Sequence, residues 1–338
     1  RLGHKLLLNA LSNTDSPGAA ARDRSDSPAR GEAWIPGSNG PGSASEGQSV
    51  LPIGSSEKDS IGDVVDELWA YVPKCQLPHL KMLAQTSYAG GNHLNFVDLK
   101  PRVFDAKIFP AGGAHPNGWG TILVCGMNLG GREITVTDPD LPGGVQTFSP
   151  SYAAFDITVP QAPVFLWEKT FPGIGFTTTI PSVIKVKDKW FLVIGSGPTS
   201  EDGTSTQNGR VFIIDLATGT LLQTFIASES NSFMNSPVAL DKGLNYTVDA
   251  IYVGCSYQSG GAWRGKAYKI AIPQLNATGQ YDPLCLSCYD DNPLNWRWQP
   301  LFESPAPFYA PFTLSVDQRD NVWIFIGTGR YIASADRM

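Results

Sequence analysis

Residues 181–195 carry the sequence PSVIKVKDKWFLVIG, in which two apolar runs flank a short polar segment. A proline opens the first run, and large apolar residues fill the second run up to Gly195. The polar residues between the runs predict a tight turn. Two short apolar runs joined in this way are typical of a β-hairpin.

The same hairpin pattern recurs three more times. Its first strands are predicted at residues 101–104, 237–240 and 311–314, and the partner strands at residues 121–126, 250–254 and 322–327. Third strands are predicted at residues 133–136, 211–216 and 267–270, and fourth strands at residues 164–168, 221–225 and 296–298. Four antiparallel strands per unit, repeated radially, describe a β-propeller. We therefore expect an all-β fold of four-stranded blades.

The blades are expected to carry long loop insertions, because the repeats are farther apart than the roughly 40–50 residues of compact propeller repeats. Residues 1–12 are predicted to end a preceding blade, and residues 63–338 to form a propeller domain that is incomplete at its C-terminus. Within this domain, residues 67–72 predict a strand, followed by a short helix with Leu77, Leu80 and Leu83 on one face. We expect the chain to be a fragment of the ring.

Between these parts, residues 13–62 are rich in Ser, Gly, Pro, Ala and Asp, and Trp34 is their only aromatic residue. Such a segment cannot bury enough apolar surface to offset the entropy lost on ordering. It is predicted to be a disordered insertion.

Charge and hydropathy exclude some partners. The formal net charge is -6, and no cluster of Lys and Arg offers a face for phosphates, so nucleic acid is not an expected partner. The longest apolar runs, such as residues 190–194, have the length of a strand, and no transmembrane segment is predicted. The chain begins at Arg1 with no apolar leader, so any export signal is expected in a preceding part.

Six short sequences occur in an order that resembles a known family. They are ELWAYVP at 67–73, NFVDLKP at 95–101, LWE at 166–168, KWFLVIGSG at 189–197, DLATG at 215–219 and IGTGRY at 326–331. In this order they are similar to the C-terminal domain of the PilY family of type IV pilus-associated adhesins and biogenesis proteins. The resemblance implies a non-enzymatic protein that is exported to the pilus tip or outer cell surface. It also implies contact with minor pilins, support of pilus extension, and attachment to a host or abiotic surface.

The resemblance further implies a calcium loop between the first two strands of one blade. The family pattern Asp-x-Asp-x-Asp-Gly-x-x-Asp falls on residues 241–249, DKGLNYTVD. The matching oxygen ligands are the side chains of Asp241, Asn245 and Asp249 and the carbonyl of Thr247. Gly243 supplies no side-chain oxygen, and Tyr246 replaces the usual glycine. The expected site is a weakened or lost calcium site, and the alternative is a polar turn closed by Asx hydrogen bonds.

The five cysteines are odd in number, so at least one has no partner within the chain. Cys285 and Cys288 have the spacing of a redox or zinc half-site, but no second pair of ligands lies near them in the sequence. In an exported protein, as the resemblance implies, a disulfide between them that closes a loop is the expected use.

Two other classes of protein remain as alternatives. Residues 215–222, DLATGTLL, also resemble the blade signature of pyrroloquinoline-quinone dehydrogenases. The sequence lacks vicinal cysteines and a regular Trp-bearing repeat, and its four histidines are scattered over different predicted loops. The third class is a scaffold in a surface complex without affinity for a surface of its own.

Overall fold

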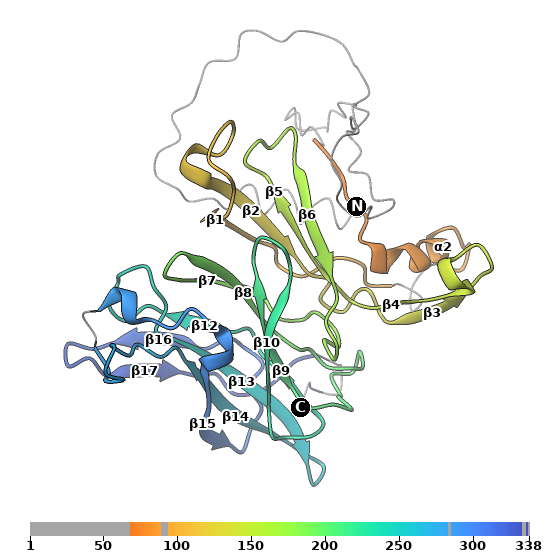
Figure 1. The fold of residues 1–338 in the computed structure, drawn as a ribbon. Coiled ribbons are helices and arrows are strands. Elements are labelled where there is room, and N and C mark those ends of the chain that lie inside the picture. The colour runs from red at the N-terminus through yellow and green to blue at the C-terminus, as the bar shows by residue number, and fades with distance from the viewer. Residues whose placement is uncertain (1–67, 89–93, 283–284, 333–335, 337–338) are drawn as a thin grey trace, which may run out of the picture.

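The computed structural model describes residues 68–88, 94–282, 285–332 and 336. Within them the chain forms antiparallel sheets that follow one another along the sequence (Figure 1). The predicted blade end at residues 1–12 and the predicted insertion at residues 13–62 lie outside the described residues. None of the helices in the described part has the length and hydrophobicity needed to cross a bilayer.

Blade one is a four-stranded sheet in the order β1-β2-β5-β6. Its strands are β1 (Arg102–Lys107), β2 (Trp119–Cys125), β5 (Tyr152–Asp156) and β6 (Val164–Lys169). The predicted first hairpin and fourth strand are confirmed. The predicted third strand at residues 133–136 is wrong, because these residues belong to a separate hairpin of β3 (Ile134–Thr137) and β4 (Val145–Phe148).

The burial pattern explains why β5, and not β3, is the third strand. A strand in the middle of a sheet that is packed on both faces has to be buried at every position. All five residues of β5 are buried, whereas β3 alternates between half-buried and exposed residues. The alternating pattern of β3 therefore fits a two-stranded hairpin outside the blade.

Blade two contains β7 (Ser182–Val186), β8 (Lys189–Gly195), β9 (Arg210–Asp215) and β10 (Leu221–Ile226), which confirms its four predicted strands. The turn between β9 and β10 is tight because Asp215 Oδ1 accepts the backbone N–H of Thr218 at 2.9 Å. Gly219 in this turn has a φ of 68°. A Cβ at this glycine would lie 2.7 Å from the Trp167 ring of blade one. The glycine therefore allows blade one to pack closely on blade two.

Blade three is built around the longest strands. It consists of β11 (Ser232–Met234), β12 (Val238–Leu240), β13 (Ala250–Ser259), β14 (Ala262–Ala271) and β15 (Arg297–Ser304). Both β11 and β12 pair with the same edge of β13, so together they act as its first strand. The break between them is held by Asn235, whose Oδ1 accepts the N–H of Gly254 at 2.7 Å. The predicted first hairpin and the third and fourth strands of this blade are confirmed.

The fourth unit is the hairpin of β16 (Thr313–Val316) and β17 (Val322–Phe325), as predicted. In the core of the described residues, β12 contacts both β7 and β16, so the first strands of three successive units lie next to one another. This arrangement is expected where blades are repeated around an axis.

Adjacent blades are held together by alternating faces of the same strands. On β8, Phe191 and Val193 belong to a core shared with blade three, whereas Leu192 and Ile194 belong to a core shared with blade one. Because successive side chains on a strand point to opposite faces, a strand between two blades needs apolar residues at every position. This need for apolar side chains on both faces explains the unbroken apolar run of β8.

The segment before blade one is mainly irregular. Residues 68–72, the described part of the predicted strand at 67–72, contain a single bridge residue, Ala70, so this strand prediction is wrong. Trp69 instead packs on Phe155, with ring centroids 5.5 Å apart, and Tyr71 stacks on Phe165. The two rings thus cover blade one. The alternation of apolar residues in this segment therefore reflects packing on the blade and not pairing in a sheet.

The predicted short helix follows as η1 (Lys74–His79) and α2 (Leu80–Leu83), with its three leucines exposed. The remaining helices of the described residues are single turns: η3 (Pro116–Gly118), η4 (Pro142–Gly144), η5 (Leu286–Cys288) and η6 (Pro293–Asn295).

Candidate functional site on blade three

Two connections of blade three leave the same end of the sheet. Residues 241–249 join β12 to β13, and residues 272–296 join β14 to β15. In an antiparallel sheet, the connections that follow the first and the third strands lie at the same end. The Tyr289 hydroxyl donates to Asp249 Oδ1 at 2.6 Å and joins the two connections. We call the surface formed by residues 241–249, 272–282 and 285–296 the loop face of blade three.

The shorter connection, the 241–249 loop, is closed by its own side chains. Asp241 Oδ1 accepts the backbone N–H of Asn245 at 3.0 Å, and Asp241 Oδ2 accepts that of Tyr246 at 2.7 Å. Asn245 Oδ1 accepts the N–H of Thr247 at 2.9 Å. At the base of the loop, Asp249 Oδ2 accepts the N–H of Lys242 at 2.6 Å. The structure thus gathers the four predicted ligand residues into one hydrogen-bonded turn.

Two residues of the 241–249 loop adopt left-handed backbone conformations. Leu244 has a φ of 51° and Tyr246 a φ of 64°. Residues with a Cβ pay on the order of 1 kcal/mol for this conformation, which glycine adopts freely. Tyr246 occupies the position where the calcium pattern has its glycine. Both side chains point away from the protein, with 84% and 83% of their surface exposed.

The residues of this loop do not fit a calcium ion well. Calcium takes six to eight oxygens. With one oxygen each, Asp241, Asn245, Asp249 and the Thr247 carbonyl supply too few, and Gly243 adds none. Both carboxylates would have to bind through both of their oxygens. Each of these carboxylate oxygens already accepts a hydrogen bond, from Asn245, Tyr246, Lys242 or Tyr289.

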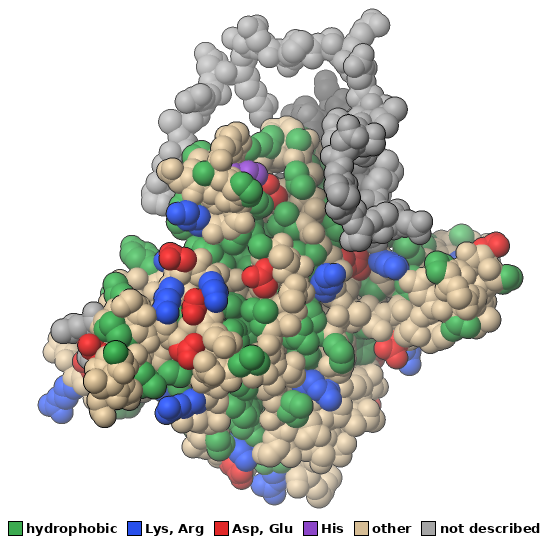
Figure 2. Space-filling view, in the orientation of Figure 1, with side chains coloured by type: hydrophobic (Ala, Val, Ile, Leu, Met, Phe, Trp, Pro, Cys, Tyr) green, Lys and Arg blue, Asp and Glu red, His purple; other side chains and the backbone are tan. Residues whose placement is uncertain are grey.

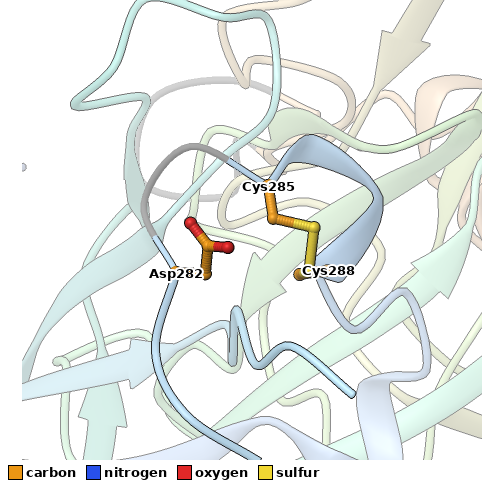
Figure 3. Close-up of side chains that lie close together, drawn as sticks. All are labelled: Asp282, Cys285 and Cys288. Carbon is orange, nitrogen blue, oxygen red and sulfur yellow. A yellow bond between two sulfur atoms is a disulfide. The ribbon is translucent and has the colours of Figure 1, made fainter. Parts of the chain in front are cut away.

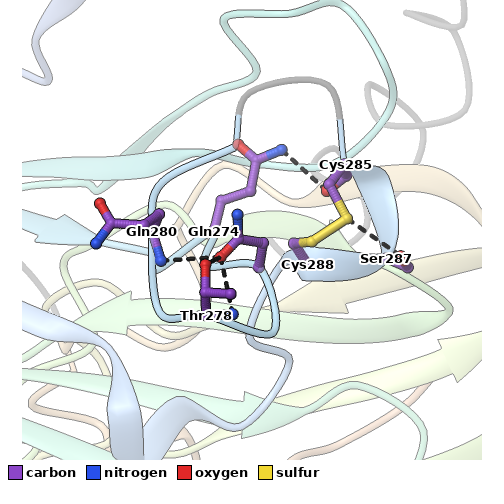
Figure 4. Close-up of a disulfide and its surroundings, with 7 residues drawn as sticks. Gln274, Thr278, Gln280, Cys285, Ser287 and Cys288 are labelled. Carbon is purple, nitrogen blue, oxygen red and sulfur yellow. Dashed lines mark hydrogen bonds between the residues drawn. A yellow bond between two sulfur atoms is a disulfide. The ribbon is translucent and has the colours of Figure 1, made fainter.

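The longer connection contains a disulfide. Cys285 and Cys288 are bonded, with their Cα atoms 5.3 Å apart (Figure 4). Gln274 Nε2 donates to the Cys285 carbonyl at 3.1 Å, and the N–H of Leu275 donates to the Cys288 carbonyl at 3.1 Å. The disulfide turn is therefore fastened to the chain that leaves β14.

Asp282 lies beside this disulfide, and one of its carboxylate oxygens is within 4.8 Å of both sulfur atoms (Figure 3). Metal ions bind cysteine as the thiolate. Because both sulfurs are used in the disulfide, this group of side chains offers one carboxylate and no thiolate. A zinc half-site is not formed in this state.

Tyr289 follows Cys288 directly and is buried. Burial raises the pKa of its hydroxyl, and the hydrogen bond to Asp249 raises it further. The hydroxyl therefore remains protonated and donates to the carboxylate across the physiological pH range. The backbone of Tyr289 pairs with Gln274 in an isolated antiparallel bridge, so the ring is presented from an ordered segment.

The loop face is also attached to blade two. Asp291 lies 3.8 Å from the ammonium of Lys187, in the turn between β7 and β8, and 3.2 Å from that of Lys189, the first residue of β8. Trp296 packs edge-on against Phe191, with ring centroids 5.3 Å apart. On the side of the molecule drawn in Figure 2, Lys and Arg side chains are interspersed with Asp and Glu side chains.

The three cysteines outside the disulfide are Cys75, Cys125 and Cys255. Burial raises the pKa of each thiol to about 12. They remain protonated near neutral pH, and a protonated thiol is a weak nucleophile and a weak metal ligand.

Sequence reasoning did not identify Tyr289 as part of this site. The only local signal is its position directly after the Cys-x-x-Cys spacing, and nothing in that signal points to Asp249. The exposure of the Leu244 and Tyr246 side chains was also not predicted, although two large apolar residues inside a polar turn are an unusual combination.

The comparisons with known proteins agree with the fold. A family model described as the PilY1 beta-propeller domain matches residues 74–338. The crystal structure of the Pseudomonas aeruginosa PilY1 C-terminal domain superposes with a TM-score of 0.56 at 22% sequence identity. That match covers 82% of this chain and 51% of the other. At this identity the likeness supports the fold alone.

Two curated relatives are also similar to this chain. The type IV pilus biogenesis factor PilY1 homolog of Xylella fastidiosa is 25% identical over 281 residues, which cover 80% of this chain and 18% of the relative. The type IV pilus biogenesis factor PilY1 of Pseudomonas aeruginosa is 26% identical over 293 residues, which cover 80% of this chain and 22% of the relative. The chain thus spans about a fifth of the length of these relatives.

Proposed function

Because the chain belongs to the PilY1 β-propeller domain family, we propose that it is a non-enzymatic domain of a type IV pilus biogenesis factor. The domain supports pilus extension, lies outside the cell at the pilus tip or outer surface, and attaches the cell to a host or abiotic surface. Its partners are minor pilins and that surface. The observation that carries this proposal is the family match over residues 74–338.

The loop face of blade three supports the attachment role. Leu244 and Tyr246 protrude from one connection, and Tyr281 and Leu286 are exposed on the other. Binding through turns whose backbone is already ordered avoids the cost of ordering a loop on binding. Strained backbone at exposed residues is found more often at binding sites than elsewhere. We assign surface contact to these side chains.

Two other functions compete with this proposal. A quinone-dependent dehydrogenase would carry a quinone absorbance and oxidise alcohols, so the absorbance spectrum and alcohol oxidation by the purified protein test it. A scaffold would support pilus assembly without affinity for a surface. The scaffold function is tested by measuring pilus assembly and cell attachment separately in the same set of variants.

The test replaces Leu244 and Tyr246 together by serine in the cells that produce the protein. A matched control replaces Val145 and Ile226, which are also exposed and apolar but lie on the β3–β4 hairpin and at the far end of β10. We expect surface pili to be assembled in equal numbers by both variants. Attachment should fall severalfold in the loop variant only.

Two results would contradict the proposal. Equal attachment by both variants would remove the attachment role from this face and favour a scaffold. Normal piliation in cells that lack the whole domain would remove the assembly role. Piliation is measured by shearing and quantifying surface pilin, and attachment by counting adherent cells after washing.

A further inference from the structure

The carboxylates of the 241–249 loop are satisfied without a cation. Asp241 uses both oxygens for backbone N–H groups of the loop itself. Asp249 uses one oxygen for the N–H of Lys242 and the other for the Tyr289 hydroxyl. A carboxylate with all of its oxygens hydrogen-bonded needs no metal to compensate its partial burial.

The loop also departs from a calcium loop at two positions that matter for the ion. Gly243 leaves the third ligand position without a side-chain oxygen, and Lys242 places a positive charge next to it. Tyr246 nevertheless keeps the left-handed conformation that a glycine would adopt there. The left-handed backbone at the sixth position of a calcium loop is therefore present while part of the ligand set is missing.

The donor that completes this arrangement comes from the other connection. Tyr289 is 40 residues away from Asp249 in sequence and reaches it from the disulfide turn. Tyr289 is 2% exposed, and the following residue, Asp290, donates its N–H to the Pro273 carbonyl at 2.8 Å. The position of Tyr289 is therefore fixed by contacts within its own connection, independently of its hydrogen bond to the 241–249 loop.

We propose that this loop is metal-independent and that the Tyr289 hydroxyl, by binding the Asp249 carboxylate, closes it in the place of a calcium ion. The disulfide turn and the 241–249 loop thereby form one unit, and the display of Leu244 and Tyr246 does not depend on calcium. The proposal is independent of any role in pilus assembly.

The test uses the purified chain. Thermal unfolding is recorded in the presence of a chelator and in about 10 mM calcium, roughly tenfold above the weakest calcium modules. An occupied site would raise the melting temperature by a few degrees under these conditions by mass action. We expect the same melting temperature in both solutions. A higher melting temperature in calcium overturns the proposal.

Tyr289→Phe removes only the hydroxyl, and Tyr281→Phe is the matched control because Tyr281 is an exposed tyrosine of the same connection. Tyr289→Phe should speed hydrogen exchange at the amides of Tyr246 and Thr247 severalfold, whereas the control should not. Equal exchange in both variants overturns the proposal. Hydrogen exchange of the wild type tests the proposal without a variant. If the amides of Tyr246 and Thr247 are protected in chelator and calcium does not increase that protection, the proposal is supported. An increase in protection with calcium overturns it.

A designed variant shows that the assay detects a calcium site. Gly243→Asp together with Tyr289→Phe adds a third carboxylate and frees one oxygen of Asp249. Calcium stabilisation of this variant alone supports the proposal, and equal stabilisation of the wild type overturns it.

Discussion

Lys266 on β14 contacts two glutamates that differ sharply in burial. Its ammonium lies 2.7 Å from Glu229 Oε1 and 3.1 Å from Glu303 Oε1. The Glu229 side chain is 9% exposed, that of Lys266 15%, and that of Glu303 65%. Glu229 also accepts hydrogen bonds from the hydroxyls of Tyr268 and Ser228. The same lysine therefore takes part in one largely buried pair and one surface pair.

The two pairs should contribute very different amounts to stability. Removing one partner of a buried pair costs about 3–5 kcal/mol, because the other charge is left without compensation. Glu229 keeps two hydroxyl donors, so we expect Lys266→Met to cost about 2 kcal/mol, below that range. The pair with Glu303 is exposed to solvent and should be worth about 0.5 kcal/mol at most.

Urea unfolding of Glu229→Gln, Glu303→Gln and Lys266→Met measures these values, with the wild type as reference. Glu303→Gln should unfold at almost the wild-type midpoint. A double variant, Glu229→Gln with Lys266→Met, should cost less than the sum of the single changes, since neither charge is left alone. Equal losses from the two glutamate substitutions would falsify this reasoning, because burial would then not decide the strength of the pairs.

Three further outcomes are expected. Burial alone would raise the pKa of Glu229, but the hydrogen bonds from Lys266, Tyr268 and Ser228 outweigh it and hold the pKa below its usual value. The stability that the ionised Glu229 contributes is therefore complete above the unfolded pKa of about 4.3 and is lost as the pH falls through the folded pKa. The melting temperature of Glu229→Gln should consequently depend less on pH in acid than that of the wild type. Replacing both Cys285 and Cys288 by serine should lower the unfolding free energy by about 2 kcal/mol, the value for a very short loop, in chemical denaturation. The buried thiols of Cys75 and Cys255 should react with an alkylating reagent near pH 8 only after denaturant is added, and mass spectrometry that finds labelled Cys255 in the folded protein would contradict the burial of that thiol.

Some of the site could be anticipated from the sequence. The spacing of Asp241, Asn245 and Asp249 indicated a polar loop between two strands, and Asx hydrogen bonds of the expected kind are present. These contacts join residues only a few positions apart, so the local sequence is sufficient to specify them. The departures at Gly243 and Tyr246 also indicated a poor calcium site before any geometry was known.

The hairpins of the blades were determined by the sequence alone, because a strand pattern of period two and a turn between two such strands depend on neighbouring residues. The third strand of blade one was decided only by the tertiary structure. The choice between β3 and β5 depends on which segment is covered on both faces, and that covering comes from blade two and from the rings of Trp69 and Tyr71. The bond of Tyr289 to Asp249, across 40 residues, and that of Lys266 to Glu229, across 37, likewise depend on how strands and connections pack together. A periodic pattern specifies which face of a strand is apolar, but the partner of that face is selected by the packing of the whole domain.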